Sequence, residues 1–297
     1  MPNARRRALS WAAAAALALA AGCASVEPEG PARKETIYAV TAGSVELVKF
    51  NAGQPRRILE RRPVTGLAAG DRLVGIDYRV ARGILYALSA RGILYTLNTR
   101  TGALTQVGSA PAALALAGSS FGFDFNPAAD RIRVVSESGQ NLRLHPDTGA
   151  VVDGNPNLEG IQPDGNLAYV AGDPNFGQQP EIVAAGYTYN KQDEKITTNY
   201  AIDRRLGVLV MQGSREGATP VVSPNTGQLR TVGPLGLGRL IDATLDIADV
   251  SNAAFAAVRT IEDARTRLYE IDLQAGRARL IGTVADGAPI IGMAIEP

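Results

Sequence analysis

The chain has few of the residues on which most catalytic and metal sites depend. Its 297 residues include one histidine, His145, and one cysteine, Cys23. A Ser-His-Asp triad or a histidine-rich zinc site needs a suitably placed histidine, and we expect His145 to lie in a hairpin turn away from any such site. One cysteine cannot form an internal disulfide bond. No Walker or dinucleotide-binding glycine loop precedes a predicted helix, so the common nucleotide-binding sites are also excluded.

Net charge and aromatic residues are scarce as well. Lys and Arg number 30 against 29 Asp and Glu, so no overall field attracts polyanions, and we expect no nucleic-acid partner. Aromatic residues make up 5% of the chain, whereas Gly and Pro number 32 and 17. This composition favours many short strands joined by tight turns over long helices. The length suits one large all-β domain or two ordinary domains.

The first 22 residues have the pattern of an export signal. Arg5-Arg6-Arg7 is a basic start, and the apolar run from Leu9 to Ala20 is too short to span a membrane comfortably. Ala20-Ala21-Gly22-Cys23 resembles the lipobox at which bacterial lipoproteins are cleaved and lipidated, although Ala20 stands where Leu is commonest. We therefore predict a signal peptide over 1–22 and a lipid on Cys23. The alternative is an ordinary secretory signal with an incidental cysteine.

A lipid on Cys23 would place the protein in the bacterial cell envelope, with the membrane as a partner. Lipidation also leaves no thiol as a nucleophile. Ala24, rather than Asp, follows the cysteine, and by resemblance to lipoprotein sorting this favours the outer membrane. A secreted or periplasmic protein is the alternative location. The Pro, Gly and charged residues that follow predict a flexible tether over 23–35.

A turn that ends in glycine recurs along the rest of the chain. Each copy has an apolar residue that ends a strand, polar turn residues and then a glycine that can adopt positive φ. The glycines are Gly53, Gly102, Gly149, Gly227 and Gly276, with spacings of 49, 47, 78 and 49 residues. A period near fifty with several strands in each repeat is typical of propeller blades.

A second repeated element supports this architecture and predicts how the ring closes. Its copies precede four of the turns, and a fifth copy ends the chain without a turn after it. Because the first turn lacks its own copy, the C-terminal strand can complete the N-terminal blade and remove the free sheet edges. The copies are Gly75-Ile76-Asp77-Tyr78, Gly122-Phe123-Asp124-Phe125, Gly186-Tyr187-Thr188-Tyr189, Thr244-Leu245-Asp246-Ile247 and Gly292-Met293-Ala294-Ile295.

The sequence therefore predicts an all-β fold, a β-propeller of about five four-stranded blades over residues 36–297. A pair of β-sandwiches would also show short strands and glycine turns, but it does not explain the regular spacing or the unpaired last strand. Six blades are the other alternative, since the 78-residue interval could hide a degenerate blade. We favour a loop insertion at about 151–179, where turn residues are dense and alternation is weak.

One central run resembles a bacterial family catalogued as domain of unknown function 4394. The matching residues are Ser120 to Pro127, Asp130 to Ser136, Gln140 to Leu144 and Pro146 to Gly149. The resemblance covers roughly residues 36 to 297. It implies a secreted or envelope protein with propeller-like repeats. It implies no activity and no catalytic residue, because the family has none assigned.

Three aspartates hold matching positions in the repeat, namely Asp77, Asp124 and Asp246. By analogy with propellers in general, these residues project towards the central channel. Three converging carboxylates could hold a hard cation such as Ca²⁺ or act as acid and base. Alternatively, each could cap a turn or bind the backbone of the next blade. Thr188 and Ala294 hold the other two positions and interrupt the ring.

The insertion supplies a second set of candidate ligand residues, Asp153, Asp164 and Asp173. Insertions of this kind join one blade to the next on the face where propellers usually admit ligands, and long loops are often functional. The spacing of a calcium-binding loop is absent from the insertion. It either contacts a ligand or cation or is a solvated cover over the channel mouth.

Two functions remain open at this stage. The first is a non-catalytic binding or scaffold lipoprotein that holds a small molecule, a glycan or a protein. The second is a metal-assisted hydrolase or lactonase-like enzyme with a cation, most simply Ca²⁺, held by Asp77, Asp124 and Asp246. We expect no other cofactor.

Overall fold

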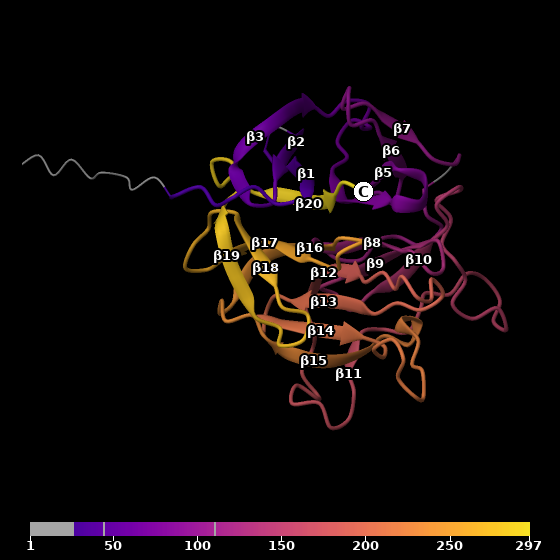
Figure 1. Cartoon of the computed structure of the whole chain (residues 1–297). Coiled ribbons are helices and arrows are strands. Elements are labelled where there is room, and N and C mark those ends of the chain that lie inside the picture. Colours follow the sequence, from indigo (N-terminus) through magenta and orange to yellow (C-terminus); the bar gives the residue numbers. More distant parts are fainter. Residues whose placement is uncertain (1–26, 44, 110) are drawn as a thin grey trace, which may run out of the picture.

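The computed structural model describes residues 27–43, 45–109 and 111–297, and its strands form five sheets arranged in a ring (Figure 1). The protein is a five-bladed β-propeller, as the repeats predicted. Among the described residues, no helix is long and apolar enough to cross a membrane. The innermost strands of the blades are β4 (Leu73–Arg79), β8 (Phe121–Asn126), β12 (Ile182–Tyr187), β16 (Leu240–Ile247) and β20 (Ile290–Ile295).

The first blade confirms the predicted closure. Its strands follow the order β20-β1-β2-β3, so the last strand of the chain is the innermost strand of the N-terminal sheet. β20 pairs antiparallel with β1, with Ala294 opposite Tyr38. The two ends of the chain thus hold the ring shut through main-chain hydrogen bonds. The other strands of this blade are β1 (Thr36–Thr41), β2 (Glu46–Asn51) and β3 (Gln54–Pro63).

The second and fifth blades have the expected four antiparallel strands, in chain order from the channel outwards. A short 3₁₀ helix, η1 (Val80–Arg82), joins the first two strands of the second blade. The outer strands of the second blade are β5 (Ile84–Ser89), β6 (Leu94–Leu97) and β7 (Leu104–Gln106), and those of the fifth are β17 (Ala254–Thr260), β18 (Arg267–Ile271) and β19 (Ala278–Thr283).

The third and fourth blades depart from four strands because of the insertion between them. The third has three strands, and a single bridge from Leu144 to Val151 stands where a fourth would begin. Beyond it the chain crosses to the fourth blade, where β11 (Ala168–Tyr169) pairs in parallel with the outermost regular strand. Part of the insertion is thus the outer edge of a blade. The remaining strands are β9 (Arg131–Ser136) and β10 (Asn141–Leu144) in the third blade, and β13 (Asn199–Asp203), β14 (Val208–Gln212) and β15 (Gln228–Pro234) in the fourth, with a 3₁₀ helix η2 (Pro224–Thr226) before β15.

The glycines of the predicted turns are needed for two different reasons. Gly102, Gly149, Gly227 and Gly276 have φ between 71° and 77°, the left-handed region that other residues rarely adopt. Gly53 is needed for space instead, since a Cβ there would lie 2.0 Å from the carbonyl oxygen of Pro31.

The hydrophobic core lies between the blades. Each of the core clusters formed by described residues joins two neighbouring sheets. In one of them Tyr38 and Leu47 of the first blade pack against Ile76 and Leu85 of the second. A blade therefore buries its apolar faces only against its neighbours, which makes closure of the ring necessary for stability.

The expected flexible tether over 23–35 is docked from Glu27 onwards. Residues 27–35, which we call the strap, lie across the seam between the fifth and first blades. The side chain of Asn51 holds the strap backbone, accepting from the N–H of Arg33 at 2.8 Å and donating to its carbonyl at 2.8 Å. Arg33 makes a two-bond ion pair with Glu270 on β18 and lies over the ring of Phe255 on β17. The strap thus fastens the two blades that closure brings together.

Candidate functional site in the central channel

The three aspartates of the repeat converge at the centre of the ring. Asp77, Asp124 and Asp246 lie near the C-terminal ends of β4, β8 and β16, and each is at least 94% buried. One carboxylate oxygen from each lies within 4.8 Å of those of the other two. Among the described residues this is the one group of three or more acidic, histidine or cysteine side chains close enough to hold a metal ion.

Each carboxylate also binds the backbone of the neighbouring blade. The N–H of Phe125 donates to Asp77 Oδ2 at 2.7 Å, and the N–H of Tyr187 donates to Asp124 Oδ2 at 2.9 Å. Asp246 accepts from the N–H of Ile295 at 2.5 Å. The three aspartates therefore bind the backbone of the next blade, as the alternative interpretation expected. They also lie close together at the centre of the ring, so both arrangements are present at once.

The predicted position of the third copy of the repeated element, in the fourth blade, was wrong by two residues. Asp124 binds the N–H of Tyr187, where Asp77 binds that of Phe125, so Tyr187 corresponds to Phe125 and Gly186 to Asp124. Gly186, rather than Thr188, therefore stands beside the three aspartates. A shift of two residues leaves the alternation along a strand unchanged, so the sequence pattern does not distinguish the two registers.

The channel beside the carboxylates is almost filled by the inner strands. A Cβ on Gly75 would lie 2.5 Å from Cβ of Phe123, and one on Gly122 would lie 2.6 Å from the carbonyl carbon of Ala184. The cavity between these strands measures about 10 Å³, which is room for one water molecule. Thr244 lines it, and the buried hydroxyl of Thr244 has no hydrogen-bond partner among the described residues. This part of the channel can admit an ion or a water but not an organic substrate.

The environment of the three carboxylates favours their neutral forms. Burial, followed by repulsion from Asp246, raises the pKa of Asp77 well above its usual value. Burial, with repulsion from Asp77 and Asp246, does the same to the pKa of Asp124. Burial raises the pKa of Asp246 to about 7, although the N–H groups of Ile295 and Ile247 oppose that shift. None of the three forms an ion pair with a described residue, so a bound proton or a cation would relieve the repulsion among them.

One further carboxylate belongs to this region. Asp249 lies in the connection from β16 to β17, and burial raises its pKa to about 6. Its charge adds to the rise in the pKa values of Asp77, Asp124 and Asp246. The repeat pattern did not identify this residue, because Asp249 lies in a connection after the repeated element.

The insertion aspartates lie apart from this group and already have partners. Asp153 accepts hydrogen bonds from the N–H groups of Asn155 and Gln162, which shape its own loop. Asp173 accepts from the N–H and hydroxyl of Thr231 on β15. The geometry gives both a role in holding the insertion, while their predicted contact with a ligand stays a prediction.

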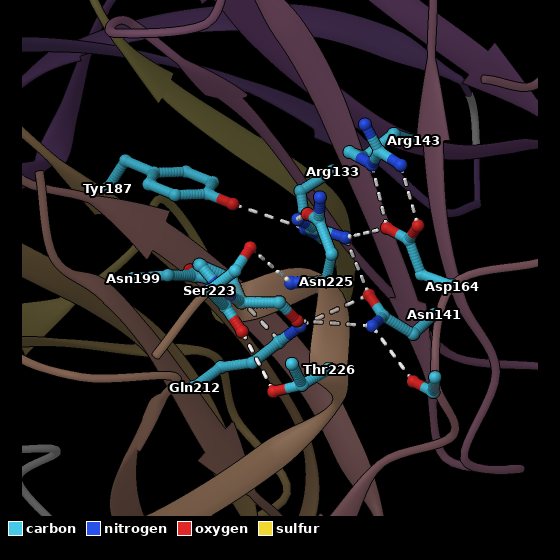
Figure 2. A network of polar contacts seen from close by, with 12 residues as sticks. Arg133, Asn141, Arg143, Asp164, Tyr187, Asn199, Gln212, Ser223, Asn225 and Thr226 are labelled. Atoms are coloured by element: carbon cyan, nitrogen blue, oxygen red, sulfur yellow. Dashed lines mark hydrogen bonds and ion pairs between the residues drawn. The ribbon is translucent and has the colours of Figure 1, made fainter. Parts of the chain in front are cut away.

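Asp164 belongs to a buried polar network that the sequence argument missed (Figure 2). Its carboxylate is 1% exposed and pairs with Arg133 on β9 at 2.6 Å and with Arg143 on β10 at 2.8 Å. Arg133, itself 2% exposed, also donates to the hydroxyl of Tyr187 at 3.1 Å and to Asn225 at 2.6 Å. The available signal was a charged residue inside an apolar strand, Arg131-Ile132-Arg133-Val134-Val135. The network joins the third blade, the insertion and the fourth blade.

Cys23 lies outside the described residues, so its lipidation stays a prediction.

Residues 46–294 match a family described as Domain of unknown function (DUF4394). The chain belongs to the DUF4394 family. This confirms the resemblance seen in the central run of the sequence. No curated protein matches this DUF4394 chain.

Solved structures resemble this DUF4394 protein only at low sequence identity. A structural-genomics protein of unknown function from Bacteroides thetaiotaomicron is 12% identical with a TM-score of 0.47, and the match covers 79% of this chain and 56% of that one. The chain thus spans little more than half of that protein. Myxococcus xanthus glutaminyl cyclase is 13% identical with a TM-score of 0.48, and the match covers 83% of this chain and 86% of the cyclase. A putative 6-phosphogluconolactonase from Bacteroides uniformis is 14% identical with a TM-score of 0.41, at 84% and 82% coverage.

Proposed function

We propose that this DUF4394 protein is a non-catalytic binding or scaffold lipoprotein of the bacterial envelope. Its partner, a small molecule, a glycan or a protein, binds outside the channel. The observation that carries this proposal is the burial of the three carboxylates: each aspartate is at least 94% buried, and the cavity between the adjoining parts of the inner strands holds about one water, at about 10 Å³. A propeller hydrolase that used those carboxylates would need room for a substrate there.

Hydrolysis assays on the mature protein test the absence of catalysis. Ester and lactone substrates are offered in the presence of Ca²⁺ to the native protein and to Asp124→Asn. We expect both to match the rate in buffer alone. Hydrolysis by the native protein that Asp124→Asn abolishes would overturn the proposal. A binding role also predicts saturable binding of labelled protein to isolated envelope fragments, with competition by unlabelled protein.

Cation binding by Asp77, Asp124 and Asp246 is the second candidate. It is supported by three buried carboxylates within 4.8 Å of one another that form no ion pair with a described residue, and by the buried, unpartnered hydroxyl of Thr244 on the same strand as Asp246. Ca²⁺ suits such a site because it prefers oxygen ligands. Since each aspartate also holds the next blade, the ion would strengthen the centre of the ring.

Thermal unfolding in Ca²⁺, Mg²⁺ or chelator tests the cation site. A ligand at 100 times its dissociation constant stabilises the folded state by about 2.7 kcal/mol, which corresponds to roughly 5–10 °C for a domain of this size. Asp124→Asn should lose this increase, whereas Asp153→Asn in the insertion should keep it. Equal melting temperatures in all three buffers would contradict the cation site and leave the scaffold proposal standing.

The envelope location depends on the anchor. We propose that the lipid on Cys23 holds the protein in the outer membrane. Cys23→Ser should move the protein from the membrane fraction to the soluble fraction. Retention of Cys23→Ser in the membrane fraction would count against the anchor.

A further inference from the structure

We propose that the outer edge formed by β3 and β19 faces the membrane and contacts anionic phospholipid headgroups. The propeller then stands on its edge, with both ends of the channel turned away from the bilayer surface. This inference rests on the proposed lipid anchor at Cys23. It adds which surface of the propeller faces the membrane.

The place where the chain joins the propeller restricts its orientation. Glu27, the first described residue, accepts hydrogen bonds from the N–H and hydroxyl of Thr283 at 3.0 and 2.9 Å and pairs with Arg267 at 2.8 Å. A Cβ on Gly282 would lie 3.3 Å from Pro55 and 3.9 Å from the Glu27 carboxylate. The chain therefore reaches the propeller at the seam between β19 and β3, beside which the strap runs (Figure 1).

Little chain separates this seam from the lipid. Only residues 24–26 lie between Cys23 and Glu27. Four Cα-to-Cα steps span at most about 14 Å when fully extended. A domain of this length has a radius of gyration of about 18 Å. Because the connection is shorter than that radius, the edge near Glu27 must stay close to the bilayer surface.

The side chains on this edge suit an anionic surface. β3 carries Arg56, Arg57, Arg61 and Arg62 in a chain whose net charge is +1, and Arg61 and Arg62 form ion pairs with Glu46 and Glu60. Arg56 and Arg57 are exposed and form no ion pair with a described residue. The positive charge that this edge offers to an anionic surface is therefore that of Arg56 and Arg57.

Two exposed leucines lie on the same edge. Leu59 on β3 and Leu280 on β19 are each 48% exposed; the two strands are in contact, and Leu280 lies on the face of β19 that is turned towards the fourth blade. Arginines on such an edge also guard against pairing with other sheets, so charge alone does not identify a membrane surface. The proximity of the anchor and the exposed leucines favour lipid headgroups as the partner. The strength of the contact comes from the anchor, which raises the local concentration of the edge at the bilayer.

Single tryptophans can report which edge meets the bilayer. The only tryptophan of the chain, Trp11, lies in the predicted signal peptide, so the mature protein has none. Leu59→Trp places a probe on the proposed edge. Leu158→Trp is the matched control, since Leu158 is 56% exposed in the insertion after the third blade, opposite the seam between the fifth and first blades. Both variants are lipidated at Cys23 and bound to vesicles that contain phosphatidylglycerol and brominated lipid.

We expect the bilayer to quench the fluorescence of Leu59→Trp and to leave that of Leu158→Trp unchanged. Equal quenching of the two, with the lipid on Cys23 verified by mass, would overturn the edge orientation while leaving the anchor intact. Attachment of Cys23 to a maleimide lipid allows this test independently of processing in cells. Absence of the lipid from Cys23 in cells would overturn the anchor itself, together with this proposal.

A charge variant tests the headgroup contact. In the Leu59→Trp background, Arg56→Gln with Arg57→Gln removes two arginines, each of which strengthens association with an anionic surface about fivefold. The edge should then associate about 30-fold more weakly, and quenching should fall to the level seen with neutral phosphatidylcholine vesicles. Unchanged quenching on both lipid compositions would exclude the anionic headgroup as the partner.

Discussion

Asp164→Asn is expected to weaken the joint between the third and fourth blades. The substitution keeps the size of the side chain but removes its charge and replaces one of its two acceptor oxygens, both of which accept from arginine N–H groups, by an NH2 donor. Asp164 is 1% exposed and is the shared partner of Arg133, 2% exposed, and Arg143, 20% exposed. In the variant the guanidinium of Arg133 stays buried with only neutral partners, among them Asn141 and Asn225 (Figure 2).

The size of the effect follows from what each arginine can do once the carboxylate is gone. Breaking a buried ion pair by removing one partner costs about 3–5 kcal/mol, because the remaining charge is uncompensated. Arg143 is partly exposed and can be hydrated, and Arg133 keeps its neutral hydrogen bonds. We therefore expect the lower end of the range, about 3 kcal/mol of unfolding free energy.

Equilibrium denaturation in urea measures this difference, with Asp153→Asn as a matched control in the same insertion. Asp153 accepts only backbone N–H groups, which an asparagine oxygen can also accept, so a change of about 0.5 kcal/mol or less is expected. Replacing the pair by apolar residues, Arg133→Met with Asp164→Leu, should recover much of the loss. An Asp164→Asn protein as stable as the control would refute the reasoning.

Three other predictions concern the channel and the seam. In chelator, the melting temperature should fall as pH rises from about 4 to about 7. Burial raises the pKa of Asp246 to about 7, so over this range the folded state loses a proton that stabilises it. A melting temperature that stays constant over this range would contradict the prediction. Gly122→Ala should lower the unfolding free energy by about 2–3 kcal/mol, since its Cβ would meet the backbone of β12 at 2.6 Å, whereas Gly43→Ala, with nothing within 4 Å, should have little effect in the same denaturation experiment. Arg33→Ala should raise the pKa of Glu270 from about 2 in an NMR titration, and the loss of stability that accompanies acidification from the unfolded pKa towards pH 2 should become shallower; an unchanged pKa would exclude the ion pair.

Much of the fold could be predicted because its determinants are local and repeated. Gly102 and Gly276 mark turns that need positive φ, and any residue with a Cβ would be strained there. The last strand, Ile290–Ile295, has no turn or further strands after it in the sequence. This predicted that it completes the N-terminal blade, and its pairing with β1 confirms the prediction. The convergence of Asp77, Asp124 and Asp246 could also be predicted from the repeats, because equivalent positions in a ring of blades face the same axis.

The repeat pattern failed where contacts depend on distant residues. Gly186 rather than Thr188 stands in the ring, as the hydrogen bond from the N–H of Tyr187 to Asp124 shows, and that bond joins residues 63 positions apart in the chain. Arg133 and Asp164 are 31 residues apart and meet only because the insertion folds onto the fourth blade.

The sequence by itself determined the propeller architecture, the closure by the C-terminal strand and the aspartates near the axis, because turn chemistry and strand alternation are properties of short segments. The structure decided between five blades and six. Only the tertiary structure decided what those parts do together. Close packing of the inner strands left room for about one water, and the strap crossed the seam because Asn51 and Glu270 bind it there. Such distances between segments far apart in the chain are set by packing the whole ring, and no local pattern encodes them.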